Sequence, residues 1–230
     1  MNPILLIFFI FVVYYFIPHI FKKIQVKSFS TKVENSQSVY LTFDDGPTKE
    51  STVAILNLLN EEKAKATFFP TGKNVLSHPE VTDRIINEGH SIGSHSFAHP
   101  HAWKTLPIKT YMDWKKNQKV FNSILGKRYT SYRPPYGKFN FVSMIMFMLS
   151  PQKAIFWTVD PEDYAKDNPE EIAKMVIEQL KPGSVVLLHD ARSESGQSDP
   201  EVTLKALKLI LNHGKENQIN FETIDHIYQS

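Results

Sequence analysis

The sequence predicts an α/β domain built on a parallel β-sheet, most simply a barrel related to the TIM type. Apolar, β-prone segments recur along the chain, and we expect seven strands, at 39–43, 65–70, 90–94, 130–133, 154–159, 184–189 and 221–224. Helical patterns lie between most of them, at 49–62, 79–88, 108–125, 168–180 and 200–213. A typical helix start, with a capping side chain followed by a proline and two acids, occurs at Asn168-Pro169-Glu170-Glu171. Strands that alternate with helices favour a parallel sheet.

Size and composition are those of an ordinary globular domain. The chain has 230 residues, of which 42% are hydrophobic and 22% charged, and this length is enough for one domain with a sizeable core. The net charge of +2 and the scattered lysines argue against a nucleic-acid partner. The sequence has no cysteine, so a metal ion is expected to bind through His, Asp or Glu. We expect a monomer.

The N-terminus differs from the rest of the chain. Residues 4–17 form an unbroken apolar and aromatic run, which continues through residues 20–21. A helix of about 18 residues reaches about 27 Å, just enough for a thin bilayer. We interpret residues 1–24 as an uncleaved membrane anchor, 25–37 as a polar linker and 38–230 as the folded domain. A signal peptide or a buried helix of the domain are the alternatives, although a charged n-region and a small-residue cleavage site are missing.

The charges beside this run conflict with the expected location of the domain. Lys22, Lys23 and Lys27 follow the run, and only the terminal amine precedes it. The positive-inside rule would therefore place the domain in the cytoplasm. The function indicated by the motifs below requires it outside. We predict a single-pass protein of the cell membrane with its domain outside, against the charge pattern.

Polar residues follow one predicted strand after another. In chain order, these residues are Asp44 and Asp45, His95, Arg133, Asp160 and Asp163, and His189. Because the carboxyl ends of parallel strands form one rim, where active sites are built, we expect these side chains to form a single site.

Two of these segments predict a metal site. Asp44 and Asp45 are adjacent carboxylates at a buried strand end, and they repel each other unless a cation or a proton separates them. His95 and His99 have the i,i+4 spacing, which on one helical turn brings Cβ atoms to about 5–6 Å. One aspartate and two histidines suit hydrolytic Zn²⁺ and also accept Co²⁺, Ni²⁺ or Fe²⁺. The alternatives are an ordinary Asp-Gly turn and a pair of surface histidines, and His101 close by resembles a ligand.

Two more segments carry candidate catalytic groups. The stiff loop Arg133-Pro134-Pro135-Tyr136-Gly137 is able to hold an arginine near a carboxylate and to direct a backbone N–H into a pocket. His189 closes an apolar strand, and a nearby aspartate would raise its pKa toward a value useful for a general acid. A purely structural loop and a core histidine are the alternatives.

Together these segments resemble the polysaccharide deacetylase (NodB-homology) family of carbohydrate esterases. The resemblance covers residues 38–227 and rests on five motifs in the family's order: TFDDGP at 42–47, HSFAH at 95–99, RPPYG at 133–137, DPEDY at 160–164 and LLH at 187–189. It implies a distorted (β/α)₇ barrel that removes N-linked acetyl groups from N-acetylglucosamine-type residues of a glycan polymer.

The resemblance also implies a role for each matching residue. Asp45, His95 and His99 would bind one divalent metal ion. Asp44 would be the general base, and Arg133 would orient it.

The remaining implied roles concern proton donation and substrate contact. His189 would be the general acid, tuned by Asp163, and the backbone N–H of Tyr136 would help form an oxyanion hole. Substrate contacts are expected from Pro134, Tyr164 and Leu187, with Leu187 lining the acetyl pocket. The family usually has Trp where this chain has Tyr164, which bears on substrate fit more than on catalysis.

The sequence leaves the polymer and some alternatives open. Peptidoglycan, chitin oligomers and an exopolysaccharide all contain suitable sugars. An esterase acting on O-acetylated glycan would use the same metal centre. A catalytically silent sugar-binding domain would lack a base, ligand or acid, and an unrelated barrel hydrolase would not depend on metal.

Overall fold

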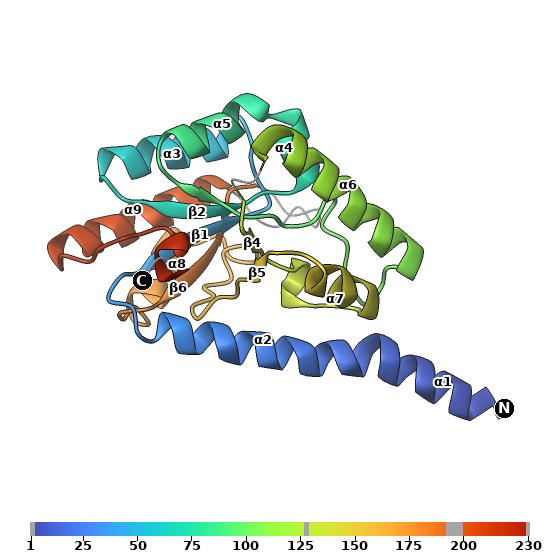
Figure 1. Ribbon diagram of the computed structural model, residues 1–230. Helices are drawn as coiled ribbons and strands as arrows, with labels where there is room; N and C mark the ends of the chain where they lie inside the picture. The colour runs from blue at the N-terminus through green and yellow to red at the C-terminus, as the bar shows by residue number, and fades with distance from the viewer. Residues whose placement is uncertain (1–2, 127–128, 192–199, 229–230) are drawn as a thin grey trace.

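Parallel strands form the centre of the molecule, and helices cover their outer face (Figure 1). The computed structural model describes residues 3–126, 129–191 and 200–228. The main sheet has the order β3-β2-β1-β6 and contains β1 (Tyr40–Asp44), β2 (Ala66–Phe69), β3 (Ser91–Ile92) and β6 (Val185–His189). A second parallel pair contains β4 (Ser131–Tyr132) and β5 (Lys153–Ala154). The α/β class with a parallel sheet is therefore confirmed.

Single bridges connect the two sheets into a ring. Ser94 pairs with Tyr132 and so links the end of β3 to β4. Val159, five residues after β5, pairs with Val186 of β6. The segment from β5 to Val159 therefore joins both sheets, and the ring encloses an interior.

The expected seventh strand is the main difference from the sequence prediction. In the described residues, 221–224 contributes only a bridge from Phe221 to Val39, and a 3₁₀ helix, η3 (Ile224–Tyr228), follows at once. The N–H of Ile224 donates to the side chain of Thr67 instead of a strand carbonyl. The β-prone composition of residues 221–224 favours a strand, but it does not show where their backbone groups find hydrogen-bond partners. The expected strands at 130–133 and 154–159 are likewise reduced to two-residue strands and bridges.

The helices correspond well to the periodic segments. The expected helices are found as α3 (Ser51–Glu61), α5 (Pro79–Asn87), α6 (Pro107–Leu125), α8 (Pro169–Ile177) and α9 (Pro200–Glu216). Asn168 caps α8 by accepting from the N–H of Glu171, as predicted. Two short helices were missed, α4 (Gly72–Ser77) and α7 (Phe141–Met148), although Asn140 and Ser143 form a capping box for α7.

Successive side chains of β1 point alternately to the core beneath the helices and to the interior of the ring. Leu41 and Phe43 point outward into the core beneath the helices, and Tyr40 belongs to a second, inner cluster. Thr42 and Asp44 share the face of Tyr40, and the side chains of both contact Arg133. The polar end of this face therefore lies inside the ring, where the site is built.

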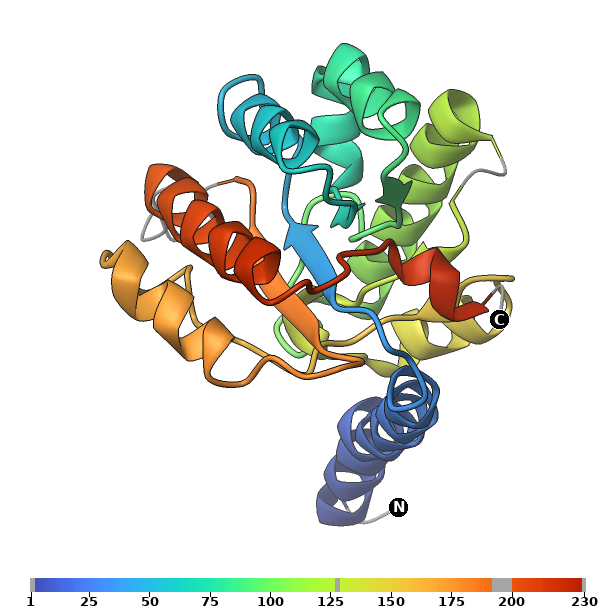
Figure 2. The ribbon, with the colours of Figure 1, turned by 90° about the vertical axis from the view of Figure 1, so that its left-hand side faces the viewer.

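The N-terminal segment forms one long helical rod below the domain (Figures 1 and 2). It consists of α1 (Pro3–Phe11), a π-helical turn η1 (Val12–Phe16) and α2 (Ile17–Val33). Pro18 has no N–H to donate to the carbonyl one turn earlier, and the N–H of Ile17 reaches back to Val12. By length and composition, the helix Pro3–Val33 is sufficient to cross a membrane.

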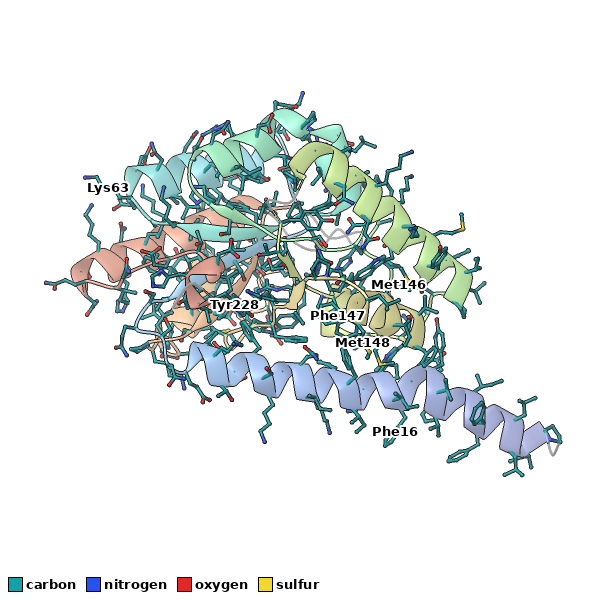
Figure 3. All side chains as sticks on the ribbon, viewed as in Figure 1. Phe16, Lys63, Met146, Phe147, Met148 and Tyr228 are labelled. Carbon is teal, nitrogen blue, oxygen red and sulfur yellow. The ribbon has the colours of Figure 1, made fainter. Side chains whose placement is uncertain are left out.

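Part of the expected linker is helical and packs on the domain. The sequence assigned residues 25–37 to a polar linker, but α2 continues to Val33, and Phe29 and Val33 are buried in the inner cluster. A Cβ at Gly183, where φ is +80°, would lie 2.1 Å from the carbonyl oxygen of Val33. The polar composition of residues 25–37 could not predict this packing. Two apolar side chains one helical turn apart, Phe29 and Val33, are enough to hold the helix against the domain. Phe147 packs against this side of the rod, whereas Phe16 points away (Figure 3).

We predict that the buried side of α2 contributes to domain stability, unlike the exposed side of the rod at η1. Phe29 is 3% exposed, so Phe29→Ala should lower the free energy of unfolding by about 3 kcal/mol. Phe16 is 53% exposed, so Phe16→Ala serves as the matched control and should change it little. Urea denaturation of the full chain in detergent measures both. Equal effects would mean that α2 is not part of the domain.

Candidate active site

The groups at the strand ends surround one cleft of about 400 Å³. The cleft is lined by Asp44, Asp45, His95, His99, Tyr136, Lys138, Trp157, Asp160, Tyr164, Leu187 and His189. All of these except Lys138 and Trp157 belong to the strand-end segments from which the sequence predicted a single site. A cavity of about 450 Å³ between α2 and α7 has neither a carboxylate nor a histidine in its lining. The chemistry of the lining therefore identifies the first cleft as the candidate active site.

Asp44 is held by a fully buried arginine. Arg133 Nη1 donates to Asp44 Oδ1 at 2.7 Å and to Thr42 Oγ1 at 2.8 Å, and Nη2 donates to the carbonyl of Phe156 at 3.3 Å. Burial raises the pKa of Asp44, and the positive charge of Arg133 opposes that rise. The arginine thus fixes one carboxylate oxygen and directs the other, Oδ2, toward His95 Nε2 at 3.6 Å.

Asp45, His95 and His99 form a cluster suited to a metal ion. One potential ligand atom from each residue lies within 4.8 Å of the others. Asp45 Oδ1 is 3.8 Å from His95 Nε2 and 3.6 Å from His99 Nε2, and it is buried without a hydrogen-bond partner. A buried carboxylate oxygen without a partner is costly, and a cation at this point would remove that cost. The donor set therefore fits a divalent ion.

The imidazole of His95 is oriented so that Nε2 faces Asp45 and His99. Its Nδ1 lies 2.7 Å from the carbonyl oxygen of Arg133, which can only accept a hydrogen bond. The proton is thereby placed on Nδ1, and Nε2 presents its lone pair to the cluster. Burial, with a smaller contribution from His99, lowers the pKa of His95 to about 3, so the ring is neutral.

The two histidines meet through a loop and not through a helical turn. The expected i,i+4 geometry is wrong, because residues 95–99 contain no helix. Ser96 and His99 adopt positive φ angles of 64° and 52°, which return the chain toward His95 and bring the rings to 4.8 Å. Asp113 of α6 accepts hydrogen bonds from the N–H groups of residues 97 and 98. This support was missed, because an aspartate in a helix carries no sequence signal for it.

The Arg133–Gly137 loop brings Tyr136 next to His99 of the candidate metal site. Tyr136 has a φ of 55° inside a 3₁₀ turn, and its ring lies 4.6 Å from the ring of His99. Its backbone N–H stays a predicted oxyanion-hole donor. Pro134 is buried and does not line the cleft, although its carbonyl accepts the N–H of Gly137.

His189 and Asp163 form a tight pair on the opposite side. His189 Nδ1 is 2.7 Å from Asp163 Oδ1, and the other carboxylate oxygen accepts from the N–H of His189 and from Thr203. Burial lowers the pKa of His189, but Asp163, followed by Asp44 and Asp45, raises it to about 9. A cation beside Asp45 would offset part of that rise. The pairing leaves Nε2 as the nitrogen not engaged by Asp163.

The rest of the lining combines apolar and aromatic side chains with two charged ones. Leu187 and Tyr164 both line the cleft, and the ring of Tyr164 meets His189 edge-on at 5.4 Å. Trp157 and Lys138 also line it, and no role for either was expected from the sequence. Asp160 lines it as well, in agreement with the expected position of its strand end.

Asp190 supports the Asp44-Asp45 turn from behind. It is 1% exposed, its Oδ1 accepts from the N–H of Gly46, and its Oδ2 accepts from Thr52. A Cβ on Gly46 would lie 2.1 Å from this carboxylate, so only glycine fits there. The sequence placed Asp190 next to His189 but gave no sign that it faces β1.

Comparisons with known proteins agree with this geometry. A family model described as Polysaccharide deacetylase matches residues 31–144. A peptidoglycan-N-acetylglucosamine deacetylase from Listeria monocytogenes is 34% identical over 86% of this chain. A chitooligosaccharide deacetylase from Bradyrhizobium is 30% identical over 78% of this chain and 85% of its own length. The solved peptidoglycan deacetylase PdaC from Bacillus subtilis has a TM-score of 0.74 and 29% identity, over 85% of this chain and 91% of that one.

The chain therefore belongs to the polysaccharide deacetylase family, as its motifs predicted. The chain covers different shares of its relatives' lengths. The matched region spans 40% of the length of the Listeria protein. The relatives' activities therefore apply to this chain only as proposals.

We predict that the two adjacent carboxylates are separable by their metal binding. Asp45→Asn should weaken binding of one divalent ion per chain, because it removes a charged ligand. Asp44→Asn should retain the ion, because Asp44 is engaged by Arg133. Elemental analysis after dialysis, with His95→Ala and His99→Ala as positive controls for loss, measures this. Reversed behaviour of the two aspartate variants would reverse the assignment.

Proposed function

We propose that the chain is a divalent-metal-dependent hydrolase that removes N-linked acetyl groups from N-acetylglucosamine-type residues of a polysaccharide. The products are acetate and a free amine. The supporting observation is the convergence on one cleft of an arginine-bound carboxylate, an Asp-His-His cluster and an Asp-His pair. The complete set distinguishes this proposal from a silent sugar-binding domain, which would lack at least one of them.

The metal we propose is Zn²⁺, held by Asp45, His95 and His99, with Co²⁺, Ni²⁺ or Fe²⁺ as alternatives of the same ligand preference. When bound, such an ion supplies Lewis-acid polarisation and lowers the pKa of a bound water. The remaining chemistry belongs to side chains of this chain.

Asp44 acts as the general base and His189 as the general acid. Asp44 Oδ2 accepts a proton from the attacking water as its oxygen bonds to the acetyl carbonyl carbon. The oxyanion that develops is met by the N–H of Tyr136. His189 Nε2 then gives its proton to the leaving nitrogen, the C–N bond breaks, and acetate and an amine result. Protonation is needed because an amide anion is a very poor leaving group.

The substrate is proposed to lie between the metal cluster and the aromatic wall. Leu187 is 4% exposed at the base of the cleft and suits the acetyl methyl group. Tyr164 is 36% exposed at the wall and is able to stack on a sugar face. Pro134 acts through the loop that carries Tyr136 and not by direct contact.

The domain boundaries and the location follow from the same reasoning. We propose that residues 38–230 form the catalytic domain, a distorted (β/α)₇ barrel in which the segment bridged at Phe221 takes the seventh place. We further propose that the N-terminal segment, residues 1–24, anchors the chain in the cell membrane, with the domain outside, where wall and surface polymers occur. Peptidoglycan, chitin oligomers and exopolysaccharide all offer the required acetamido group. An O-acetyl glycan esterase would use the same residues.

We predict that candidate glycans lose acetyl groups when they are incubated with the full chain. Mass spectrometry should show a loss for each hydrolysed acetamide, accompanied by free amine and acetate. Asp44→Asn, which keeps Arg133 and the metal ligands, is the matched control and should abolish the change. Appearance of free hydroxyl without amine would identify the esterase instead. Activity that persists after chelation would contradict the metal-dependent mechanism.

We predict a bell-shaped dependence of the deacetylation rate on pH, because Asp44 must be ionised while His189 is protonated. The rate falls on the alkaline side as His189 loses its proton. Asp163 raises the pKa of His189, so Asp163→Asn should move the alkaline limb to lower pH and leave the acid limb nearly fixed. Asp167→Asn, an exposed acid in the same segment, is the control. An unmoved alkaline limb would assign it to a group other than His189.

A further inference from the structure

A group of large apolar side chains lies exposed on the loop before α6 and on the first turns of α6. We call it the 103–112 surface, and it contains Trp103, Leu106, Ile108, Tyr111 and Met112, which are 40%, 60%, 61%, 44% and 62% exposed. The last three have the i, i+3, i+4 spacing and so share one face of the first turns of α6. A soluble surface rarely gathers so many large apolar side chains within ten residues.

This surface is fastened to the part of the rod that leaves the domain. Tyr14 Oη donates to the carbonyl of Thr105 at 3.0 Å, and Tyr15 Oη donates to that of Trp103 at 3.4 Å. The rings of Tyr15 and Trp103 meet edge-on at 6.3 Å. The loop before α6 therefore lies directly beside the π-helical turn η1 of the rod.

In the described residues, the part of the rod beyond η1 is shorter than a bilayer is thick. It is α1, with 9 residues, which at about 1.5 Å per residue extends about 13 Å. The hydrocarbon core of a bilayer is about 30 Å thick. A rod inserted to the depth of its apolar run would therefore carry the 103–112 surface into the interface as well.

The side chains near this surface suit the headgroup region. Five exposed lysines lie between residues 104 and 119, at 104, 109, 115, 116 and 119, and the single acid in that stretch, Asp113, is engaged by backbone N–H groups. Tryptophan and tyrosine at the junction are the aromatic residues enriched at membrane interfaces. Apolar residues flanked by lysines match an anionic phospholipid surface.

We propose that the 103–112 surface is a second membrane-contact site, which inserts into an anionic phospholipid bilayer beside α1. This inference rests on the proposed anchoring role of the N-terminal segment. Two points of contact fix the orientation of the domain, whereas a single helix leaves it free to rotate about the helix axis.

The orientation places the cleft at the membrane surface. A series of rings connects them: His99 to Tyr136 at 4.6 Å, Tyr136 to His101 at 4.8 Å, and His101 to Trp103 at 6.4 Å. Lys138, which lines the cleft, also places its ammonium 4.6 Å from the ring of Trp103. The substrate would therefore be glycan held close to the bilayer, either the innermost part of a polymer or a chain carried on a lipid.

The test is quenching of tryptophan fluorescence by brominated lipid. The full chain is reconstituted in phosphatidylcholine–phosphatidylglycerol vesicles in which the phosphatidylcholine carries bromine near the top of its acyl chains. The chain has three tryptophans: Trp114 is 4% exposed, Trp157 lines the cleft, and Trp103 belongs to the 103–112 surface. We expect bromine to quench the wild type and Trp103→Phe to lose most of that quenching.

Matched variants test the surface without altering the fluorophore. The double variant Ile108→Ser, Met112→Ser should lose the quenching, and Leu209→Ser, at an exposed position of α9, should retain it. All should cleave a soluble acetylated oligosaccharide at the wild-type rate, which verifies folding and tests the proposed function separately. Wild-type chain that floats with the vesicles while Trp103 stays unquenched would overturn the proposal, and the N-terminal segment alone would then be the anchor. A cross-linked dimer with unquenched Trp103 would assign the surface to a second copy and overturn it as well.

Discussion

The buried ion pair between Arg133 and Asp44 is the interaction on which the site depends. Transfer of a guanidinium and a carboxylate from water to a protein interior costs several kcal/mol per ion, and close pairing with further hydrogen bonds offsets that cost. Thr42 and the carbonyl of Phe156 supply those bonds, and the guanidinium lies 4.2 Å from the ring centre of Phe69. The guanidinium of Arg133 therefore connects side chains and a carbonyl from several strand ends inside the ring.

The same residue connects Asp44 to the candidate metal-binding cluster of Asp45, His95 and His99. The side chain of Arg133 fixes Asp44, while its carbonyl accepts from His95 and so sets which imidazole nitrogen faces the cluster. A shift of the β4 end would disturb both functions together. Positive φ angles at Asp45, His99 and Tyr136 show that the chain is bent sharply at the points where ligands and donors converge. The surrounding hydrogen bonds, including those to Asp113 and Asp190, maintain these conformations.

The residues of the site were predictable because their motifs occur at strand ends, and parallel strands bring such ends together. The backbone conformation between the residues of a motif was not predictable. The spacing of His95 and His99 fits a helical turn equally well, and only the hydrogen bonds to Asp113 and Ser96 explain why a loop forms. Long-range support such as Asp190 to Gly46 depends on which strands are neighbours, and β6 beside β1 joins residues far apart in the sequence. Residues 192–199, which follow Asp190, lie outside the described part of the chain.

The helical packing of α2 places the positive charges near the N-terminus on the surface of the folded domain. The positive-inside rule concerns lysines and arginines in short segments beside a membrane span, and large domains are translocated with little regard to their charge. Lys22, Lys23 and Lys27 lie in α2, which is docked through Phe29 and Val33, and the ammonium of Lys22 is close to Gly137 of the domain. These lysines therefore belong to the surface of a folded unit. Because they also lie within about 15–20 residues of the apolar run, they still count against the proposed extracytoplasmic position of the domain. As cationic groups, they suit the anionic headgroups that the 103–112 surface would meet.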